Sequence, residues 1–142
     1  MANRSTAQSW TTFLGVVFVL VGILGFIPGI TSNYDEMSFA GKDSGAELLG
    51  LFQVSILHNL VHIAFGIAGL ALARSWDGAR TYLLGGGVIY LVLWLYGLFV
   101  GANDDANFVP INTADDWLHF GLGIALLLIG ILTARRRPAT AY

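Results

Sequence analysis

Charged residues are segregated along this chain, and the segregation constrains the fold more than any other feature. Eight of the nine acidic residues, but only one of the seven basic residues, fall in segments 31–47 and 101–116. These segments alternate with four apolar runs, at about residues 10–30, 48–73, 81–100 and 114–134. Each run is close to the ~20 residues that a helix needs to cross ~30 Å of hydrocarbon. The sequence therefore predicts an all-α integral membrane bundle of four transmembrane helices.

The cations predict how these helices are oriented. Arg4 precedes the first run, Arg74 and Arg80 flank the second connection, and Arg135–Arg137 follow the last run. Because Lys and Arg are enriched on the cytoplasmic side of membrane proteins, both termini are expected in the cytoplasm. The first run is about twice the length of a signal-peptide core, so we expect a membrane helix there.

The composition limits the classes of function. With 56% hydrophobic and 11% charged residues, helices and short connections account for residues 1–142 as a single membrane domain without a soluble catalytic unit. The absence of cysteine excludes disulfides and thiolate chemistry. The interiors of the runs contain no Lys, Arg, Asp or Glu, which argues against a retinal protein or a pump with a buried acid. The net charge of −2 gives no indication of nucleic-acid binding.

Glycines recur at helical intervals in three of the runs. Small residues at such spacing let helix backbones approach closely in lipid, so we expect a compact bundle. The positions are Gly15, Gly22 and Gly29 in the first run, Gly97 and Gly101 in and after the third, and Gly123 and Gly130 in the fourth.

All three histidines fall in the second and fourth runs. His58 and His62 are spaced i, i+4, so both project from one helix face. His58 and His119 each lie 16 residues before a cytoplasmic arginine, Arg74 or Arg135. That spacing places both imidazoles ~24 Å from the inner boundary, at one level of the membrane.

Polar neighbours accompany the histidines. Ser55 and Asn59 extend the face of His58 into a polar stripe, which should point into the bundle because unsatisfied polar groups are costly in lipid. His119 meets this stripe if the second and fourth helices are neighbours or diagonal partners. Asp115 precedes His119 by four residues and Asp116 by three, so either carboxylate could accept a hydrogen bond from that imidazole.

Three interpretations of these histidines remain open. A d-block metal ion could be bound by His58, His62 and His119, with Asp115 as a hydrogen-bond partner of a ligating histidine. Alternatively, histidines from two helices could ligate a b-type haem. They could instead hydrogen-bond to one another as polar contacts that fix helix register. A pH-sensing or proton-relay role is the third interpretation. Aromatic residues of the third run either line this region or are ordinary lipid-facing or core aromatics; they are Tyr90, Trp94 and Tyr96.

Three stretches resemble a bacterial family of small four-helix membrane proteins known as domain of unknown function 4383. They are LHNLVHIAFGIAGLALAR, YLLGGGVIYLVLWLYGL and NFVPINTADDWLHFGLG. The resemblance covers about residues 10–134 and implies a fold and a location in the bacterial inner membrane, without an activity. It also directs attention to the positions that it matches, which are His58, Asn59, His62, Asn112, Asp115 and His119.

Two functions follow from these observations. The first is an accessory or scaffolding subunit of a larger membrane complex or of a homo-oligomer, because the chain is small and pairs no nucleophile with a base. The alternative is a metal- or haem-binding protein that uses the histidine cluster for sensing, electron transfer or metal handling. No metalloprotease, P-loop or nucleophile-elbow motif is present, so the sequence does not predict an enzyme.

Overall fold

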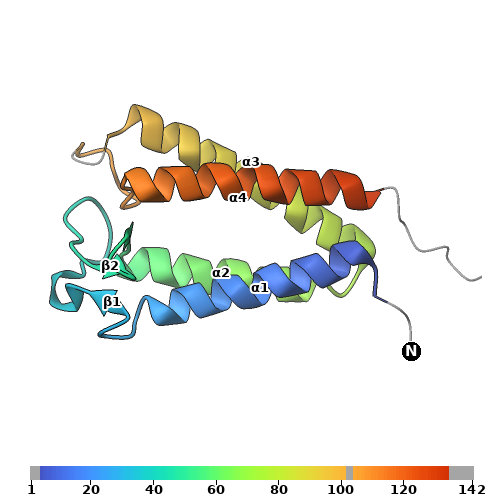
Figure 1. Ribbon diagram of the computed structural model, residues 1–142, viewed down its shortest axis with the longest axis horizontal. Helices are drawn as coiled ribbons and strands as arrows, with labels where there is room; N and C mark the ends of the chain where they lie inside the picture. Colours follow the sequence, from blue (N-terminus) through green and yellow to red (C-terminus); the bar gives the residue numbers. More distant parts are fainter. Residues whose placement is uncertain (1–3, 102–103, 135–142) are drawn as a thin grey trace, which may run out of the picture.

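Four helices form two antiparallel hairpins in the computed structural model, which describes residues 4–101 and 104–134. They are α1 (Thr6–Leu24), α2 (Ile56–Leu72), α3 (Trp76–Phe99) and α4 (Thr113–Thr133). α1 packs mainly against α2 and α3 mainly against α4, and the start of α1 and the end of α4 lie at the same end of the bundle (Figure 1). The arginines at 135–137 lie outside the described residues.

The lengths of the helices bear on the predicted membrane location. α1, α3 and α4 are each long and apolar enough to cross a membrane, whereas α2 is apolar but has 17 residues. The helical fold and its apolar character are therefore confirmed, and they define a membrane protein.

The first helix starts and ends earlier than its apolar run. Ser5 Oγ accepts a hydrogen bond from the Gln8 amide at 3.3 Å, and Gln8 Oε1 accepts one from the Ser5 amide at 3.0 Å. This capping box satisfies two amides that an open helix end would leave unpaired, so α1 begins at Thr6 rather than near residue 10. The predicted end at residue 30 was also wrong, because α1 stops at Leu24 and turns lead on to β1.

The second run was predicted to be helical from residue 48, and this was wrong. Residues 48–55 instead contribute to a three-stranded antiparallel sheet of β1 (Thr31–Ser32), β2 (Glu47–Leu48) and β3 (Phe52–Gln53), in that order. The side chains of Leu48 and Val54 are buried together with Ala46. A short 3-10 helix, η1 (Tyr34–Glu36), lies between β1 and β2.

Glycines permit the close approach of the helices within each hairpin, as the sequence predicted. A Cβ atom at Gly66 of α2 would lie 2.6 Å from the carbonyl oxygen of Gly15 in α1. In the other hairpin, a Cβ at Gly87 would lie 3.0 Å from the carbonyl oxygen of Gly123. Gly29 and Gly101 play no such part, because both lie outside the helices at positive φ with open space around them.

Aromatic side chains join the two hairpins. Phe18 of α1 stacks on Tyr90 of α3 at a centroid distance of 5.7 Å, and both are buried. The hydroxyl of Tyr82 donates a 3.1 Å hydrogen bond to the carbonyl oxygen of Phe65, one of the residues of α2 that faces α3. These contacts belong to a core that also includes Leu83 and Leu126.

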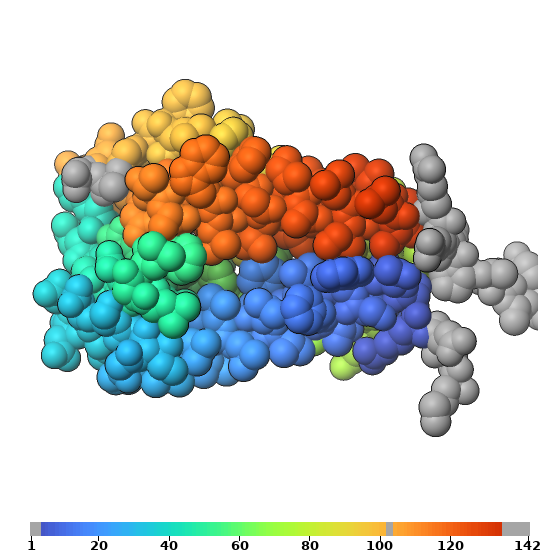
Figure 2. Space-filling model, viewed as in Figure 1, coloured from blue at the N-terminus to red at the C-terminus, as the bar shows by residue number. Residues whose placement is uncertain are grey.

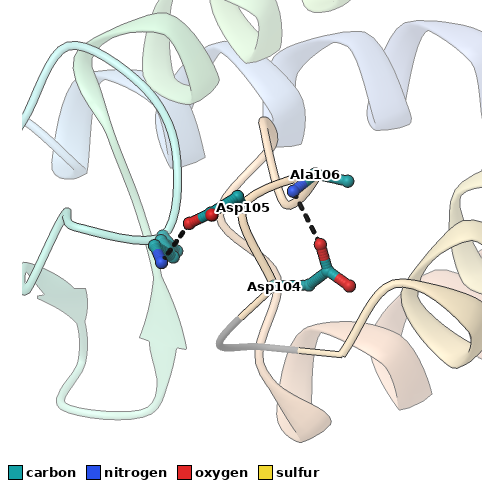
Figure 3. A network of polar contacts seen from close by, with 4 residues as sticks. Asp104, Asp105 and Ala106 are labelled. Atoms are coloured by element: carbon teal, nitrogen blue, oxygen red, sulfur yellow. Dashed lines mark hydrogen bonds and ion pairs between the residues drawn. The ribbon is translucent and has the colours of Figure 1, made fainter.

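A cap covers the end of the bundle opposite the termini, and we define it as residues 28–55 and 104–112. Figure 2 shows the sheet part of this cap beside the starts of α2 and α4. The Gly41 amide donates to the Phe108 carbonyl oxygen at 2.8 Å, and Lys42 Nζ pairs with Asp105 at 2.5 Å (Figure 3). Asn112 Nδ2 donates to the Leu51 carbonyl oxygen at 2.9 Å. The two parts of the cap are therefore bound to each other above the helix ends.

Candidate functional site

A cavity of about 250 Å³ lies next to the cap, between α2 on one side and α3 and α4 on the other. Its walls come from three helices and from the cap. α2 contributes Leu57, His58, Val61, His62 and Phe65, α3 contributes Ile89, Tyr90 and Leu93, α4 contributes His119, and the cap contributes Ser55, Phe108, Val109 and Pro110. All three histidines of the chain thus face one cavity.

His58 and His62 are positioned by the first turns of α2. Ser55 is the N-cap of this helix, and its Oγ accepts a 3.1 Å hydrogen bond from the His58 amide. One turn later, Nδ1 of His62 lies 3.1 Å from the carbonyl oxygen of His58. The two imidazole rings are 4.2 Å apart between centroids and lie next to each other at the cavity wall.

His119 enters the cavity from α4 and is almost fully buried, with 4% of its surface exposed. Its ring lies 5.4 Å from the ring of Tyr90. Tyr90 in turn stacks on Phe18, whose ring is 5.8 Å from that of His62. A chain of aromatic contacts therefore connects the histidines of α2 with the histidine of α4.

The hydrogen bonding of the imidazoles defines what the cavity can offer a ligand. Nδ1 of His58 and Nδ1 of His119 are both buried and have no hydrogen-bond partner. Nδ1 of His62 contacts a carbonyl oxygen, which can only accept, so in a neutral imidazole this nitrogen carries the proton. Nε2 of His62 then holds a lone pair. The polar nitrogens contribute almost nothing to the accessible surface of the cavity.

Of the polar residues predicted to accompany the histidines, Asn59 interacts with the His58 side chain, whereas Asp115 is used elsewhere. Asp115 Oδ2 accepts hydrogen bonds from the backbone amides of Asn112 and Gln53, at 3.0 and 3.1 Å. Within the part of the chain that the structure describes, it makes no hydrogen bond to His119. Asn59 is buried against Gly25 and donates to the sulfur of Met37 at 3.9 Å. These side chains connect the cap to the helices rather than completing a site.

The side chains that line the cavity carry no Lys, Arg, Asp or Glu. Across residues 4–101 and 104–134, no group of three or more His, Asp or Glu side chains is arranged to hold a metal ion. The cavity wall is therefore uncharged and almost wholly apolar.

Sequence reasoning found the histidines and weighed Tyr90, because these are the residues with distinctive chemistry. Of the other two aromatics in the third run, Trp94 packs on Phe120 at 4.7 Å, and the hydroxyl of Tyr96 accepts a 2.9 Å hydrogen bond from the Phe108 amide. The sequence analysis did not identify three other parts of the cavity lining, which are Phe65, Leu93 and the segment 108–110. These residues are apolar and carry no sequence signal for a cavity, since their place depends on how the cap folds back over α2 and α3.

The fold and the cavity together define a small helical membrane protein with an apolar pocket near one end of its bundle. The chain belongs to the family described as Domain of unknown function (DUF4383), whose model matches residues 8–132. The comparison with curated proteins and the comparison with solved structures each give no match.

Proposed function

We propose that this protein binds a small, uncharged ligand from the membrane in the cavity between α2, α3 and α4. The observation that carries the proposal is the convergence of His58, His62 and His119 on a single apolar cavity of about 250 Å³. The wall of this cavity is almost wholly apolar, so a ligand would be held by burial of its own apolar surface.

The size and lining of the cavity restrict the ligand. An engineered cavity of ~150 Å³ in another protein holds one benzene ring, so the cavity here has room for about two fused rings. A charged ligand would lose its hydration without meeting an opposite charge, because no ionic side chain lines the wall. The ligand should therefore be neutral, compact and largely apolar.

The proposal includes the orientation of the bundle. We propose that all four helices cross the bacterial inner membrane with both termini in the cytoplasm. Arg4, Arg74 and Arg80 support this orientation, because they lie at the ends of helices away from the cap (Figure 1). The 17 residues of α2 span ~25 Å, and the cap would then occupy the outer interface.

The two functions predicted from the sequence stay predictions. The exposed apolar side chains around the bundle suit lipid as well as another subunit, so no contact favours an accessory or scaffolding role. A haem is larger than the cavity, and its binding would require the two hairpins to separate. Metal binding by the histidines would require their side chains to change rotamer.

The test is to identify what the protein retains after purification. Native protein is extracted in mild detergent, and the organic extract of the purified sample is analysed by mass spectrometry. Leu93→Trp fills the cavity and should abolish retention of a specific compound. Leu128→Trp adds the same side chain at a half-exposed site on α4 that does not line the cavity, and it should leave retention unchanged. Equal retention by both variants would contradict the proposal.

A further inference from the structure

We infer that a second pocket, at the cap end of the α3–α4 hairpin, binds a quaternary ammonium group beside the carboxylate of Asp116. This pocket shares no lining residue with the cavity between the hairpins, so the inference does not depend on the ligand proposed there. It depends on a carboxylate without a cationic partner, on two indoles that line the same pocket, and on the negative charge of the cap.

The pocket has a volume of about 290 Å³ and lies where the end of α3 meets the start of α4, next to the cap (Figure 1). Its helical lining residues are Trp94, Gly97 and Leu98 of α3 and Thr113, Asp116 and Trp117 of α4. Leu98 and Trp117 are 56% and 65% exposed, so the pocket opens to the outside of the bundle. Polar atoms form a large share of its surface, in contrast to the cavity between the hairpins.

Asp116 buries one carboxylate oxygen and presents the other to the pocket. A Cβ atom at Gly97 would lie 2.6 Å from Cγ of Asp116, so this glycine provides the space that the carboxylate occupies. Oδ1 is buried there without a hydrogen-bond partner, which leaves Oδ2 as the oxygen that reaches the pocket. Within residues 4–101 and 104–134, no Lys, Arg or His lines the pocket. Because this carboxylate is partly desolvated, a cation next to Oδ2 would stabilise it.

The charge of the surrounding cap favours a cation as well. Segments 31–47 and 101–116 contain eight of the nine acidic residues and one of the seven basic residues. That basic residue, Lys42, is paired with Asp105. An excess of one sign of charge attracts ligands of the opposite sign and repels those of the same sign. The pocket should therefore accept cations and exclude anions.

The two indoles make an organic cation the better ligand. Trp94 and Trp117 line the pocket together with Asp116. Phe120 packs against both, with ring centroids 4.7 Å from Trp94 and 6.1 Å from Trp117, and so holds the two indoles on the same side of α4. Tryptophan is the side chain that attracts cations best through its ring, and groups of aromatic residues are used to bind quaternary ammonium ligands.

Other cations suit the pocket less well. Ca²⁺ and Mg²⁺ require about six oxygen ligands. In the described part of the chain, no group of three or more His, Asp or Glu side chains is arranged to hold a metal ion. A primary ammonium must donate several hydrogen bonds, but Oδ1 of Asn112 already accepts from the Asp115 amide at 2.9 Å. A quaternary ammonium donates none and needs only the carboxylate and the aromatic wall.

The experiment measures binding of choline to the full chain in maltoside micelles by equilibrium dialysis. 3,3-Dimethylbutanol has the same shape, with carbon in place of the charged nitrogen, and serves as the matched control ligand. We expect choline to bind more tightly than this alcohol, and Asp116→Asn to weaken choline binding about tenfold. Asp35→Asn removes the same charge from an exposed cap position outside the pocket and should change choline binding less than about twofold.

The indoles are tested in the same assay. Trp117→Leu should weaken choline binding about threefold. Trp10→Leu removes a partly exposed indole at the opposite end of the bundle and should have no effect. In case Asp116→Asn fails to fold, the indole N–H signals in NMR spectra of the unaltered protein provide a second readout. Choline should move those of Trp94 and Trp117 and leave that of Trp10 in place, and unmoved signals would overturn the inference.

A lipid head group and a free solute can both carry the quaternary ammonium, and a further ligand distinguishes these sources. Dihexanoylphosphatidylcholine has the trimethylammonium group of choline together with a phosphate and short acyl chains. If it displaces labelled choline at a lower concentration than unlabelled choline does, the site takes a lipid head group. If it requires a higher concentration, the acidic cap repels the phosphate and the site takes a free solute.

Two results would overturn the inference altogether. Equal binding of choline and 3,3-dimethylbutanol would mean that the pocket does not recognise the positive charge. Equal choline affinities of Asp116→Asn and Asp35→Asn would mean that the carboxylate in the pocket has no special part in binding. Neither result bears on the cavity between the hairpins, which the retention experiment tests separately.

Discussion

Replacement of Gly66 by alanine should destabilise the first hairpin, because α1 and α2 are in backbone contact at this position. A Cβ atom at Gly66 would lie 2.6 Å from the carbonyl oxygen of Gly15 and 2.6 Å from the amide nitrogen of Val19. Both distances are ~0.8 Å short of the 3.4 Å at which ordinary contact begins. Neither atom belongs to a side chain that can rotate away, so the helices themselves must separate.

The change in the free energy of unfolding caused by Gly66→Ala is the sum of two opposing contributions. Overpacking of a closely packed interface costs ~1–3 kcal/mol. Alanine in place of glycine within a helix contributes ~1 kcal/mol in the opposite direction. Gly85 lies in the interior of α3, and a Cβ there would meet nothing within 4 Å. Gly85→Ala therefore measures the helix-propensity contribution without overpacking. Gly85→Ala should therefore be stabilising, and Gly66→Ala should be less stable than Gly85→Ala by ~1–3 kcal/mol.

The assay is equilibrium unfolding by SDS in mixed micelles, followed by circular dichroism for the unaltered protein and both variants. Equal free energies of unfolding for Gly66→Ala and Gly85→Ala would refute the packing argument. That result would mean that α1 and α2 do not approach as closely as the structure places them.

Two further predictions concern the cap. Asn112→Ala should lower the free energy of unfolding by ~1–2 kcal/mol because it removes the N-cap of α4, whereas Thr113→Ala, at the exposed next position, should have little effect in the same assay. The hydrogen bond from Lys42 and its charge lower the pKa of Asp105, so Lys42→Gln should raise that pKa towards its usual value in a carboxyl NMR titration. Because the pKa of Asp105 is lowered in the folded state, the contribution of this pair is present at neutral pH and is lost as the pH falls through that lowered pKa. An unshifted titration in the variant would mean that the pair does not form.

Hydropathy located the helices but not all of their ends. Residues 48–55 were included in the second apolar run because Leu48, Leu51, Phe52 and Val54 are as hydrophobic as helix residues. A short apolar stretch of this kind is compatible with either a strand or a helix. Here the residues form strands because β1, β2 and β3 pair through their backbones. The start of α1 was readable, since Ser5 and Gln8 have the spacing of a capping box ahead of the apolar residues.

The histidine cavity was partly predictable for a different reason. The i, i+4 spacing placed His58 and His62 on one face of a helix, and these two residues line the same cavity wall. The contribution of Phe108 depends on the hydrogen bond between its carbonyl and the Gly41 amide, 67 residues earlier in the chain. No local pattern encodes such a pairing, so the cover of the cavity could be known only from the folded chain.

The cap also explains why Nδ1 of His119 has no hydrogen-bond partner. Asp115 lies one turn before His119 and was the expected partner of its ring, yet its Oδ2 accepts from the amides of Asn112 and Gln53. The first bond caps α4, and the second ties α4 to β3. Because the same oxygen fixes the start of the helix and its distance from the sheet, it also sets the level of His119 next to the cavity. The carboxylate therefore positions His119 through the backbone, while Nδ1 of that histidine stays without a partner.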